Sequence, residues 1–364
     1  MKITKIEAIP VAIPYRHGGP DAGWGGGSWK TLNYLIVKVE TDAGITGYGE
    51  AFGYNAIPAT RTAIETMVAP LILGRDPLAI NALHDELSLM LHIFGRYGIT
   101  MFALSGLDIA LWDIAGKAAG QPLHRLLGGA RRQTVPVYAS LLKYRDPAIV
   151  ARLTKEALGK GYKFIKLHES TVPPVEAARQ AAGEDVPIML DVNCVWNPRE
   201  ADAMADALGP SNLHWLEEPI WPPENFSALA ELRVSRGIPI ASGENACTVW
   251  QFRQMFDEGA VDYAQPSVTK VGGITEFRKI QALAETFNVR LAPHSPYFGP
   301  GFLATLHLIA AAREIESIER FYVDLDACMF GGATVPANGE LEVPRGAGLG
   351  YDPDPEFIAK YRVA

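Results

Sequence analysis

The chain has 364 residues, of which 48% are hydrophobic and 20% are charged, and its formal net charge at pH 7 is −8. The length is sufficient for about two domains, and the composition is that of an ordinary globular protein with a large core. Because the net charge is negative and both signs are interspersed, nucleic acid and acidic membranes are not expected as partners.

Neither the start of the chain nor its cysteines predict secretion. Charges at Lys5 and Glu7 interrupt the apolar run that a signal peptide would need, and no apolar run approaches the length of a membrane span. The cysteines Cys194, Cys247 and Cys328 have no spacing typical of a disulfide framework or a zinc site. We therefore expect a cytoplasmic protein without a membrane partner.

The first 125 residues predict a separate α+β domain. Apolar alternation predicts three strands, the last two joined by a turn at residues 42–44, within residues 2–13 and 32–51. Apolar positions at three- and four-residue spacing predict the helices that follow, at residues 59–73, 81–94 and 100–120.

A glycine-rich loop, residues 17–30, separates the first two strands and contains Trp24. It has too many glycines to pack and too many polar residues to be buried. We interpret it as a substrate lid.

Residues 126–323 predict a barrel in which eight apolar strands alternate with helices, beginning with PVYAS at residues 136–140. Polar residues close the other seven strands at intervals of 23 to 27 residues: Lys166, Asp191, Glu217, Glu244, Ser267, His294 and Glu319. One strand, loop and helix of such a barrel takes roughly 30 residues. The predicted fold class is α/β, a (β/α)8-type barrel with an N-terminal capping domain. Residues 324–364 lack the barrel period and are expected to complete the capping domain.

Three of these strand ends carry carboxylates, and together they predict a metal site. Asp191, Glu217 and Glu244 end three consecutive strands, and the carboxyl ends of such strands open into one mouth of the barrel. A single acid at a strand end is more often a solvated residue or a helix cap, but three in succession favour a metal. Because they offer only oxygen ligands, we expect one Mg²⁺ per chain, with Mn²⁺ able to substitute.

Proton carriers are expected on two sides of this metal. Lys166 and His168 are two residues apart on a strand, so both side chains face the same way. We expect a nearby cation and their mutual repulsion to favour their neutral forms, which allows Lys166 to abstract a proton, with His168 assisting. His294 ends the seventh strand, across the barrel, and is expected to act as a general acid or base.

Further residues are expected to contact the substrate: Asn193, Glu319, Trp24, Tyr297 and Ser267. Glu319 has two readings, a hydrogen bond to a substrate carboxylate or a cap at its strand end. His214 and Glu218 lie next to the same strand ends but are expected to be structural.

These residues and motifs together resemble the mandelate racemase/muconate lactonizing enzyme family of the enolase superfamily. The resemblance extends over nearly the whole chain and includes ALWDIAGKAAGQPLHRLLGG before the barrel, then DVN, LEEP, SGEN and KVGG. It implies a capped barrel, metal ligands at Asp191, Glu217 and Glu244, and a homo-oligomer. It also implies that Lys166 and His294 serve as acid and base in removing the proton next to a substrate carboxylate, which gives an enediolate.

Two positions depart from the family pattern. The usual Lys-x-Lys of the second barrel strand is Lys166-Leu167-His168. The sixth strand carries Ser267 where racemases have an aspartate that pairs with the histidine, and where lactonizing enzymes and dipeptide epimerases have a lysine. A serine hydroxyl can orient His294 but contributes no full charge to it. Lys270, three residues later, is out of register and expected to be structural.

The leading hypothesis is a lyase, a Mg²⁺-dependent dehydratase of a sugar acid, in which proton abstraction is followed by loss of the β-hydroxyl. The alternative is an isomerase: a cycloisomerase that opens a sugar-acid lactone or anhydro ring, or a racemase or epimerase that uses Lys166 and His294 on opposite faces. A third reading is a metal-binding protein that lost catalysis through Ser267. Retention of Lys166, His294 and all three acids argues against it.

Overall fold

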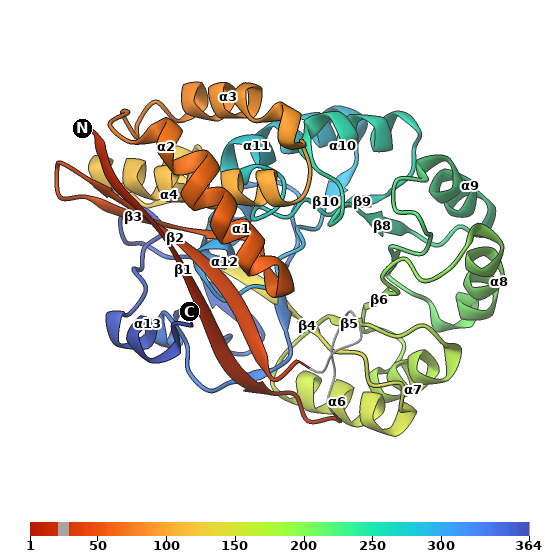
Figure 1. The fold of residues 1–364 in the computed structure, drawn as a ribbon. Coiled ribbons are helices and arrows are strands. Elements are labelled where there is room, and N and C mark those ends of the chain that lie inside the picture. The colour runs from red at the N-terminus through yellow and green to blue at the C-terminus, as the bar shows by residue number, and fades with distance from the viewer. Residues whose placement is uncertain (21–28, 364) are drawn as a thin grey trace.

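A computed structural model describes residues 1–20 and 29–363, so the predicted lid residue Trp24 lies outside the described part of the chain. A capping layer of antiparallel strands and helices lies against a barrel of parallel strands and surrounding helices (Figure 1). The predicted fold class, a (β/α) barrel with an N-terminal α+β cap, is confirmed.

The capping sheet has the strand order β12-β1-β2-β3, with antiparallel pairing throughout. Its strands are β1 (Ile3–Arg16), β2 (Thr31–Thr41), β3 (Thr46–Ala51) and β12 (Asp324–Leu325). Next come the helices η1 (Tyr54–Ala56), α1 (Ile57–Ala63), η2 (Ile64–Val68), α2 (Ala69–Ile72), α3 (Ile80–Met90), η3 (His92–Phe94), α4 (Ile99–Ala119) and α5 (Leu123–Leu126). The three predicted helices are present; the first, predicted as one α-helix, has a π-helical turn, η2, at its centre.

Helix α4 packs directly on β3 because glycines allow their backbones to approach. A Cβ built on Gly49 would lie 1.9 Å from the carbonyl oxygen of Gly106, so neither position leaves room for a side chain. Contrary to the expectation that no apolar run has membrane-spanning length, α4 is long and apolar enough by length and composition alone. In the structure 83% of that apolar window is buried inside the protein, as in the core helix of a globular domain.

Eight parallel strands form the barrel in the order β10-β9-β8-β7-β6-β5-β4-β11. They are β4 (Thr134–Ser140), β5 (Ile165–Leu167), β6 (Ile188–Asp191), β7 (Trp215–Glu217), β8 (Ile240–Ser242), β9 (Tyr263–Ala264), β10 (Arg290–Leu291) and β11 (Ile318–Phe321). The helices between them are α6 (Pro147–Gly159), α7 (Val172–Ala182), α8 (Pro198–Leu208) with η4 (Gly209–Ser211), α9 (Phe226–Arg236), α10 (Thr248–Asp257), α11 (Gly273–Phe287) and α12 (Pro300–Ala311). Among the described residues, no strand pairing joins β10 to β11.

Buried acids on α4 hold the capping layer on the barrel. Asp108 accepts hydrogen bonds from the backbone N–H and the hydroxyl of Thr275, at the start of α11, at 2.9 and 2.5 Å. Five residues further along α4, Asp113 accepts from the backbone N–H of Tyr48, on β3, and of Leu349, in the C-terminal segment, at 2.9 and 2.8 Å. These bonds satisfy backbone groups from three parts of the chain in one buried seam.

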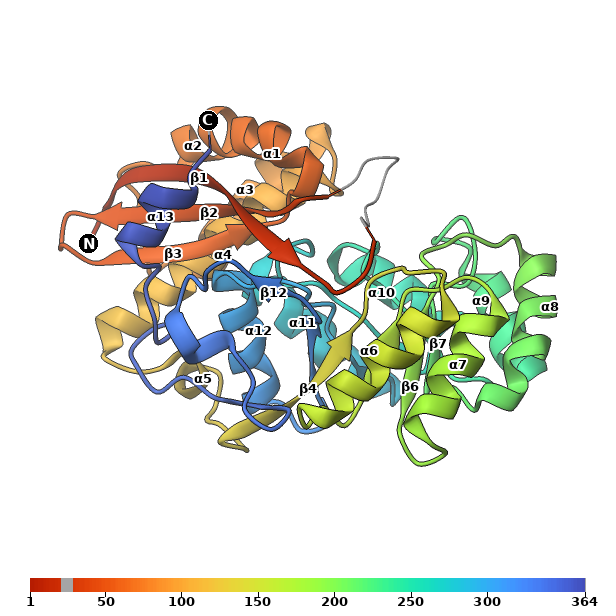
Figure 2. The same cartoon turned by 90° about the horizontal axis from the view of Figure 1, so that it is seen from below.

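The C-terminal segment, which contains η5 (Gly331–Thr334), β13 (Glu340–Glu342) and α13 (Pro355–Tyr361), runs along both layers. Helix α13 lies beside the capping sheet (Figure 2), and a bridge pairs Val11 with Arg362. Strand β13 instead pairs antiparallel with β4 of the barrel. The segment therefore closes the seam between cap and barrel, and its assignment to the capping domain alone stays a prediction.

Candidate active site

The polar residues of the barrel mouth lie directly above a buried layer of side chains that includes aromatic rings and fills the barrel interior. Met189 and Trp215 belong to a cluster that fills the barrel interior, and Asp191 and Glu217 follow them by two residues on the same strands. Because side chains two apart on a strand face the same side, both acids also point inward. The indole N–H of Trp215 donates to Glu217 Oε2 at 2.8 Å, so the aromatic layer fixes this carboxylate directly.

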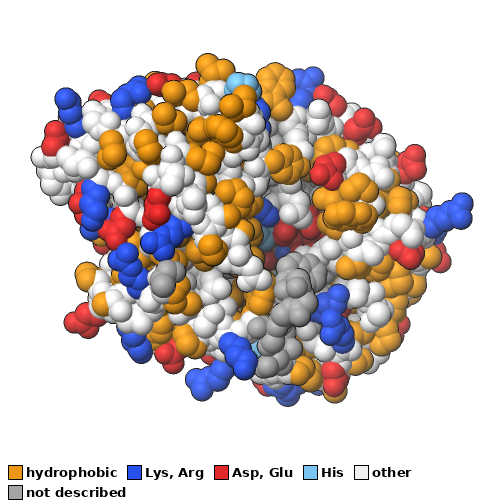
Figure 3. Space-filling model, in the orientation of Figure 1, with side chains coloured by type: hydrophobic (Ala, Val, Ile, Leu, Met, Phe, Trp, Pro, Cys, Tyr) orange, Lys and Arg blue, Asp and Glu red, His pale blue; other side chains and the backbone are white. Residues whose placement is uncertain are grey.

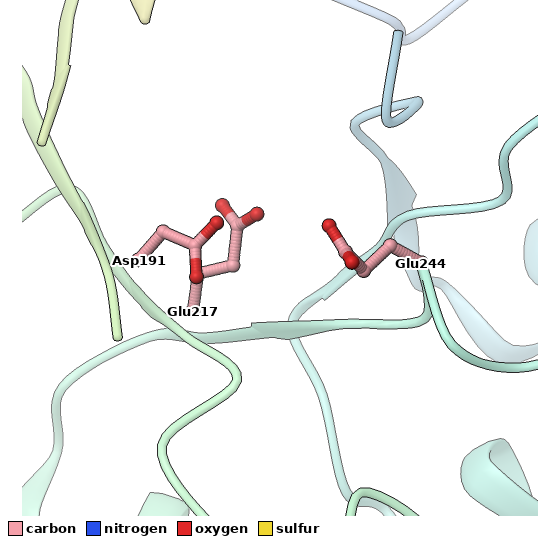
Figure 4. Close-up of side chains that lie close together, drawn as sticks. All are labelled: Asp191, Glu217 and Glu244. Carbon is pink, nitrogen blue, oxygen red and sulfur yellow. The ribbon is translucent and has the colours of Figure 1, made fainter. Parts of the chain in front are cut away.

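The three predicted metal ligands come together. Asp191, Glu217 and Glu244 each offer an oxygen within 4.8 Å of the others. Asp191 and Glu217 lie side by side, and Glu244 faces them from the opposite side (Figure 4). Oxygens this close to one another could bind one cation together.

The donor set fits a hard cation. It consists of carboxylate oxygens only, the ligands that Mg²⁺ prefers. Asp191 Oδ2 is buried and receives no well-oriented hydrogen bond among the described residues, although Lys166 and His168 lie at ion-pair distance. A buried carboxylate oxygen in this state is suited to accept a cation.

Lys166 is fully buried at the floor of the mouth and contacts three carboxylates. Its ammonium lies 2.5 Å from Glu217, 3.2 Å from Asp191 and 3.0 Å from Glu319. Burial alone would lower the pKa of Lys166, but these three charges outweigh it and raise the pKa well above its usual value. In this arrangement the amine is held protonated, whereas the neutral form expected from the sequence requires the charge of a bound cation.

The acids of the site differ in charge state. Burial raises the pKa of Glu217 well above its usual value, and the neighbouring Asp191 raises it further. For Asp191 burial acts in the same direction, but Lys166 and His168 outweigh it and hold the pKa below the usual range. For Glu244 the charge of His294 outweighs burial and lowers the pKa to about 2. Asp191 and Glu244 are therefore anionic. Of the three acids, Glu217 is the one whose ionised form requires a nearby positive charge for stabilisation.

His168 lies beside Lys166 at the same side of the mouth. One ring nitrogen, Nδ1, lies 2.6 Å from the carbonyl oxygen of Leu141, which fixes the hydrogen on that nitrogen. The other, Nε2, lies 3.3 Å from Asp191 Oδ2. His168 therefore orients a metal-site carboxylate, as a supporting residue for Lys166 would.

His294 occupies the other side of the mouth, after β10. Its Nε2 lies 2.9 Å from Glu244, and its Nδ1 lies 3.2 Å from the hydroxyl of Tyr297. That hydroxyl in turn contacts the hydroxyl of Ser267. The position that carries an aspartate in the racemase pattern thus reaches the imidazole through a tyrosine, not directly.

Tyr297 and Ser267, both predicted to contact the substrate, are 2% and 0% exposed and lie behind His294. Their geometry is that of residues that position the imidazole. Neither is among the described residues that line the cavities at the mouth.

Glu319 is held at the end of β11 by two donors. The hydroxyl of Ser140 donates to Oε1 at 2.9 Å, and the backbone N–H of Ser295 donates to Oε2 at 3.2 Å. Burial would raise the pKa of Glu319, but Lys166 outweighs it and lowers the pKa. Glu319 is thus a carboxylate paired with Lys166, and it also lines a cavity, as a substrate-binding residue would.

Two cavities open on the mouth and share Tyr54, Asn193, Glu244 and His294. Cavity A is otherwise lined by Tyr15, Trp29, Leu32, Leu142, Lys143, His168, Pro296, Glu319 and Phe321. Cavity B is otherwise lined mainly by Phe52, Tyr97, Phe102, Cys194, Glu218, Trp221, Asn245 and Lys270. A hollow with acidic side chains at its floor lies near the centre of the face seen in Figure 3.

Tyr54, Lys270 and Lys143 also line these cavities, although they are not among the predicted site residues. Tyr54 has a left-handed backbone (φ +41°), and its hydroxyl has no hydrogen-bond partner in the described residues. Lys270 is predicted to be structural, yet it lines cavity B and its ammonium lies 3.8 Å from Glu244. Lys143 follows the first barrel strand, and that position was the available signal. His214 is packed as expected, and its ring contacts Trp215 and Tyr263. Glu218, also expected to be structural, accepts a hydrogen bond from Asn245 and lines cavity B.

A capped parallel barrel whose strand ends bring three carboxylates, a lysine and a histidine together is typical of a class of metal-assisted enzymes. Two family models match the chain: "Enolase C-terminal domain-like" over residues 149–357, and "Mandelate racemase / muconate lactonizing enzyme, N-terminal domain" over residues 24–128. The chain belongs to the mandelate racemase/muconate lactonizing enzyme family of the enolase superfamily, as the sequence motifs predicted.

Its relatives include sugar-acid enzymes of two reaction classes. The chain is 34% identical over 331 residues, 88% of each chain, to an arabinonate dehydratase of Saccharolobus solfataricus. It is 31% identical over 352 residues, 91% of each chain, to a D-galactarolactone cycloisomerase of Agrobacterium fabrum.

Solved structures agree over the whole chain. An enolase superfamily member from Polaromonas sp. JS666 superposes with a TM-score of 0.89 and 34% identity, covering 100% of this chain and 98% of the other. A racemase from Streptomyces coelicolor A3(2), solved with bound magnesium, has a TM-score of 0.89 and 28% identity, covering 99% of this chain and 100% of the other.

Proposed function

We propose that this protein is a Mg²⁺-dependent dehydratase of a sugar acid. The observation that carries the proposal is the placement of two proton carriers on opposite sides of one acidic cluster. Lys166 contacts Asp191 and Glu217 on one side, and His294 contacts Glu244 on the other. A sugar acid held between them would present its α-proton to one carrier and its β-hydroxyl to the other.

Asp191, Glu217 and Glu244 would hold the Mg²⁺. When bound, the ion would supply positive charge to the substrate carboxylate and so make the α-proton more acidic. The same charge lies close to Lys166 and favours its neutral form, which is the form that accepts a proton. Glu319 lies beside Lys166 and lines cavity A, where its carboxylate is placed to accept a hydrogen bond from a substrate hydroxyl.

The residues present can account for each proton and each electron pair in the elimination. Lys166 takes the α-proton, and the electron pair of that C–H bond forms the carbon–carbon double bond. The β-carbon–oxygen bond breaks, and His294 gives its proton to the departing hydroxyl, which leaves as water. The resulting enol tautomerises to a 2-keto-3-deoxy acid. His168 and Tyr297 hold Asp191 and His294 in place during these transfers.

A cycloisomerase is the second candidate, and one relative supports it. The similar Agrobacterium fabrum protein is a D-galactarolactone cycloisomerase. Its reaction class differs in one respect: the leaving oxygen belongs to the substrate's own ring, so the ring opens and no water is released. The exchange of aspartate for Ser267 also separates this chain from the racemase pattern.

Products distinguish the candidates. Sugar acids and their lactones are incubated with the Mg²⁺-loaded enzyme in D₂O and followed by NMR. Both candidates give a keto acid that reacts with semicarbazide and carries solvent deuterium, but a dehydratase product has lost one water, whereas a cycloisomerase product has unchanged mass apart from deuterium. A racemase returns deuterated acid of inverted configuration. Lys166→Ala is the control, since it retains the three acids. Absence of any keto acid across the panel would overturn the dehydratase.

We further propose one Mg²⁺ per chain, replaceable by Mn²⁺, and a homo-oligomer. The single three-acid cluster found in the described residues supports the stoichiometry. Calorimetric titration with each metal measures it, and sedimentation velocity measures the oligomeric state. Two ions per chain, or a monomer, would contradict these points separately.

A further inference from the structure

Lys143 is a cation on the wall of cavity A that the proposed chemistry does not use. It lies in the loop between β4 and α6 and is half-buried. Within residues 1–20 and 29–363, its ammonium makes no hydrogen bond and no ion pair. Removing a cation partly from water is unfavourable unless a partner compensates, so a half-buried lysine facing a cavity indicates a binding position for an anion.

The loop that carries Lys143 is fixed by its backbone. The buried carboxylate of Glu169 accepts the N–H groups of Tyr144 and Arg145 at 2.8 and 3.0 Å. The hydroxyl of Tyr144 donates to the carbonyl oxygen of His17, at the end of the capping sheet, at 2.9 Å. Glu169 is committed to these backbone groups and forms no ion pair with Lys143, although its charge favours the charged form of the Lys143 ammonium.

The other lysines of the mouth are already engaged. Lys166 is buried among three carboxylates. Lys270, in cavity B, lies 3.8 Å from Glu244 and 4.8 Å from the ring centre of Phe52. Among the described residues that line the two cavities, Lys143 is the lysine without a partner. An additional anionic group of a substrate would therefore be stabilised in cavity A.

We propose that Lys143 binds a second carboxylate, at the far end of the substrate, and that the enzyme prefers sugar diacids (aldaric acids) or their ring forms over sugar monoacids. The inference rests on the proposed function, because it places the reacting carboxylate at the cation that Asp191, Glu217 and Glu244 would hold. A single ammonium matches a singly charged carboxylate. A phosphate dianion would need further donors, and the described lining of cavity A includes no arginine.

The test compares binding of matched aldaric and aldonic acids that share the configuration at the reacting carbons. Calorimetry on the Mg²⁺-loaded protein gives the ratio of the two dissociation constants. We expect the wild type to prefer the aldaric acid, and Lys143→Met to reduce that preference by about 10- to 100-fold, the usual range for one charge-assisted hydrogen bond. Lys143→Arg should retain most of the preference, because the positive charge remains.

Lys155→Met is the matched control, since it removes one exposed lysine from α6, outside both cavities. A wild type without preference for the aldaric acid would overturn the inference, as would equal effects of Lys143→Met and Lys155→Met. Exchange of the α-proton in D₂O is measured on the same samples. A Lys143-dependent preference without exchange would refute the proposed function and leave the carboxylate subsite standing.

Discussion

Glu50 gives a sharp prediction about stability, because burial opposes its charge. It lies on β3 at the seam between cap and barrel and is 2% exposed. It accepts one hydrogen bond, from the backbone N–H of Gly301 at 2.8 Å, and has no cationic partner in the described residues. Burial raises the pKa of Glu50 from 4.5 to about 8, and the bond from Gly301 offsets this only in part.

The sign and size of the effect follow from linkage. The folded protein retains the proton on Glu50 up to about pH 8, whereas the unfolded chain releases it near 4.5. The stability that Glu50 contributes is therefore complete below about pH 4.5 and is lost as the pH rises towards 8. At about 1.4 kcal/mol per pH unit, the total loss is ~5 kcal/mol. Glu50→Gln cannot ionise and should escape this loss.

Urea unfolding of the wild type and of Glu50→Gln, from about pH 5 to about pH 9, checks the reasoning. The variant should gain on the wild type by about 1.4 kcal/mol per pH unit until pH 8, and then hold a constant advantage. Glu285→Gln, an exposed change on α11, is the control and should follow the wild type. A difference between wild type and Glu50→Gln that does not vary with pH would refute the reasoning, because Glu50 would then be ionised in the folded state.

Three further outcomes follow from the site. Glu217→Gln should weaken Mg²⁺ binding by more than about tenfold, because it removes one of three anionic ligands; unchanged affinity in a calorimetric titration would exclude Glu217 as a ligand. If Lys166 is the base, Lys166→Ala should lose both turnover and exchange of the α-proton with D₂O, while His294→Asn should lose turnover but retain exchange. Loss of exchange in the His294 variant alone would reverse the assignment. Tyr297→Phe should lower kcat by about tenfold, because Nδ1 of His294 loses its contact with the hydroxyl, and should leave Mg²⁺ affinity unchanged; a fall in Mg²⁺ affinity instead would place Tyr297 with the metal ligands.

The barrel and its acids could be predicted because both follow from local patterns. A strand that is buried on both sides is a short apolar run, and its polar end marks the mouth of the barrel. Spacing alone therefore predicted that three side chains from different strands lie close together, those of Asp191, Glu217 and Glu244. The hairpin of the capping sheet could also be predicted, because alternating apolar and polar residues on both sides of a turn at residues 42–44 specify two antiparallel strands.

Contacts between distant segments could not be predicted in the same way. Ser267 and Tyr297 are 30 residues apart, and only the folded loops after β9 and β10 show that one hydroxyl reaches the imidazole through the other. The sequence places Lys143 just after the first barrel strand, but whether its ammonium has an ion-pair partner depends on the folded structure. The substrate role expected for Tyr297 stays a prediction; the structure shows a buried side chain whose hydroxyl contacts His294.

The walls and the floor of cavity A have different origins in the chain. The side chains proposed to move protons and to bind the metal all come from the ends of barrel strands, whereas Trp29, Leu32 and Tyr54 reach the same space from the capping layer. Substitution of a capping residue can therefore reshape the space for the substrate's far end without disturbing the groups that move protons. Such a division lets one reaction chemistry be inherited while the choice of sugar acid changes, which agrees with the variety of acids named among its relatives.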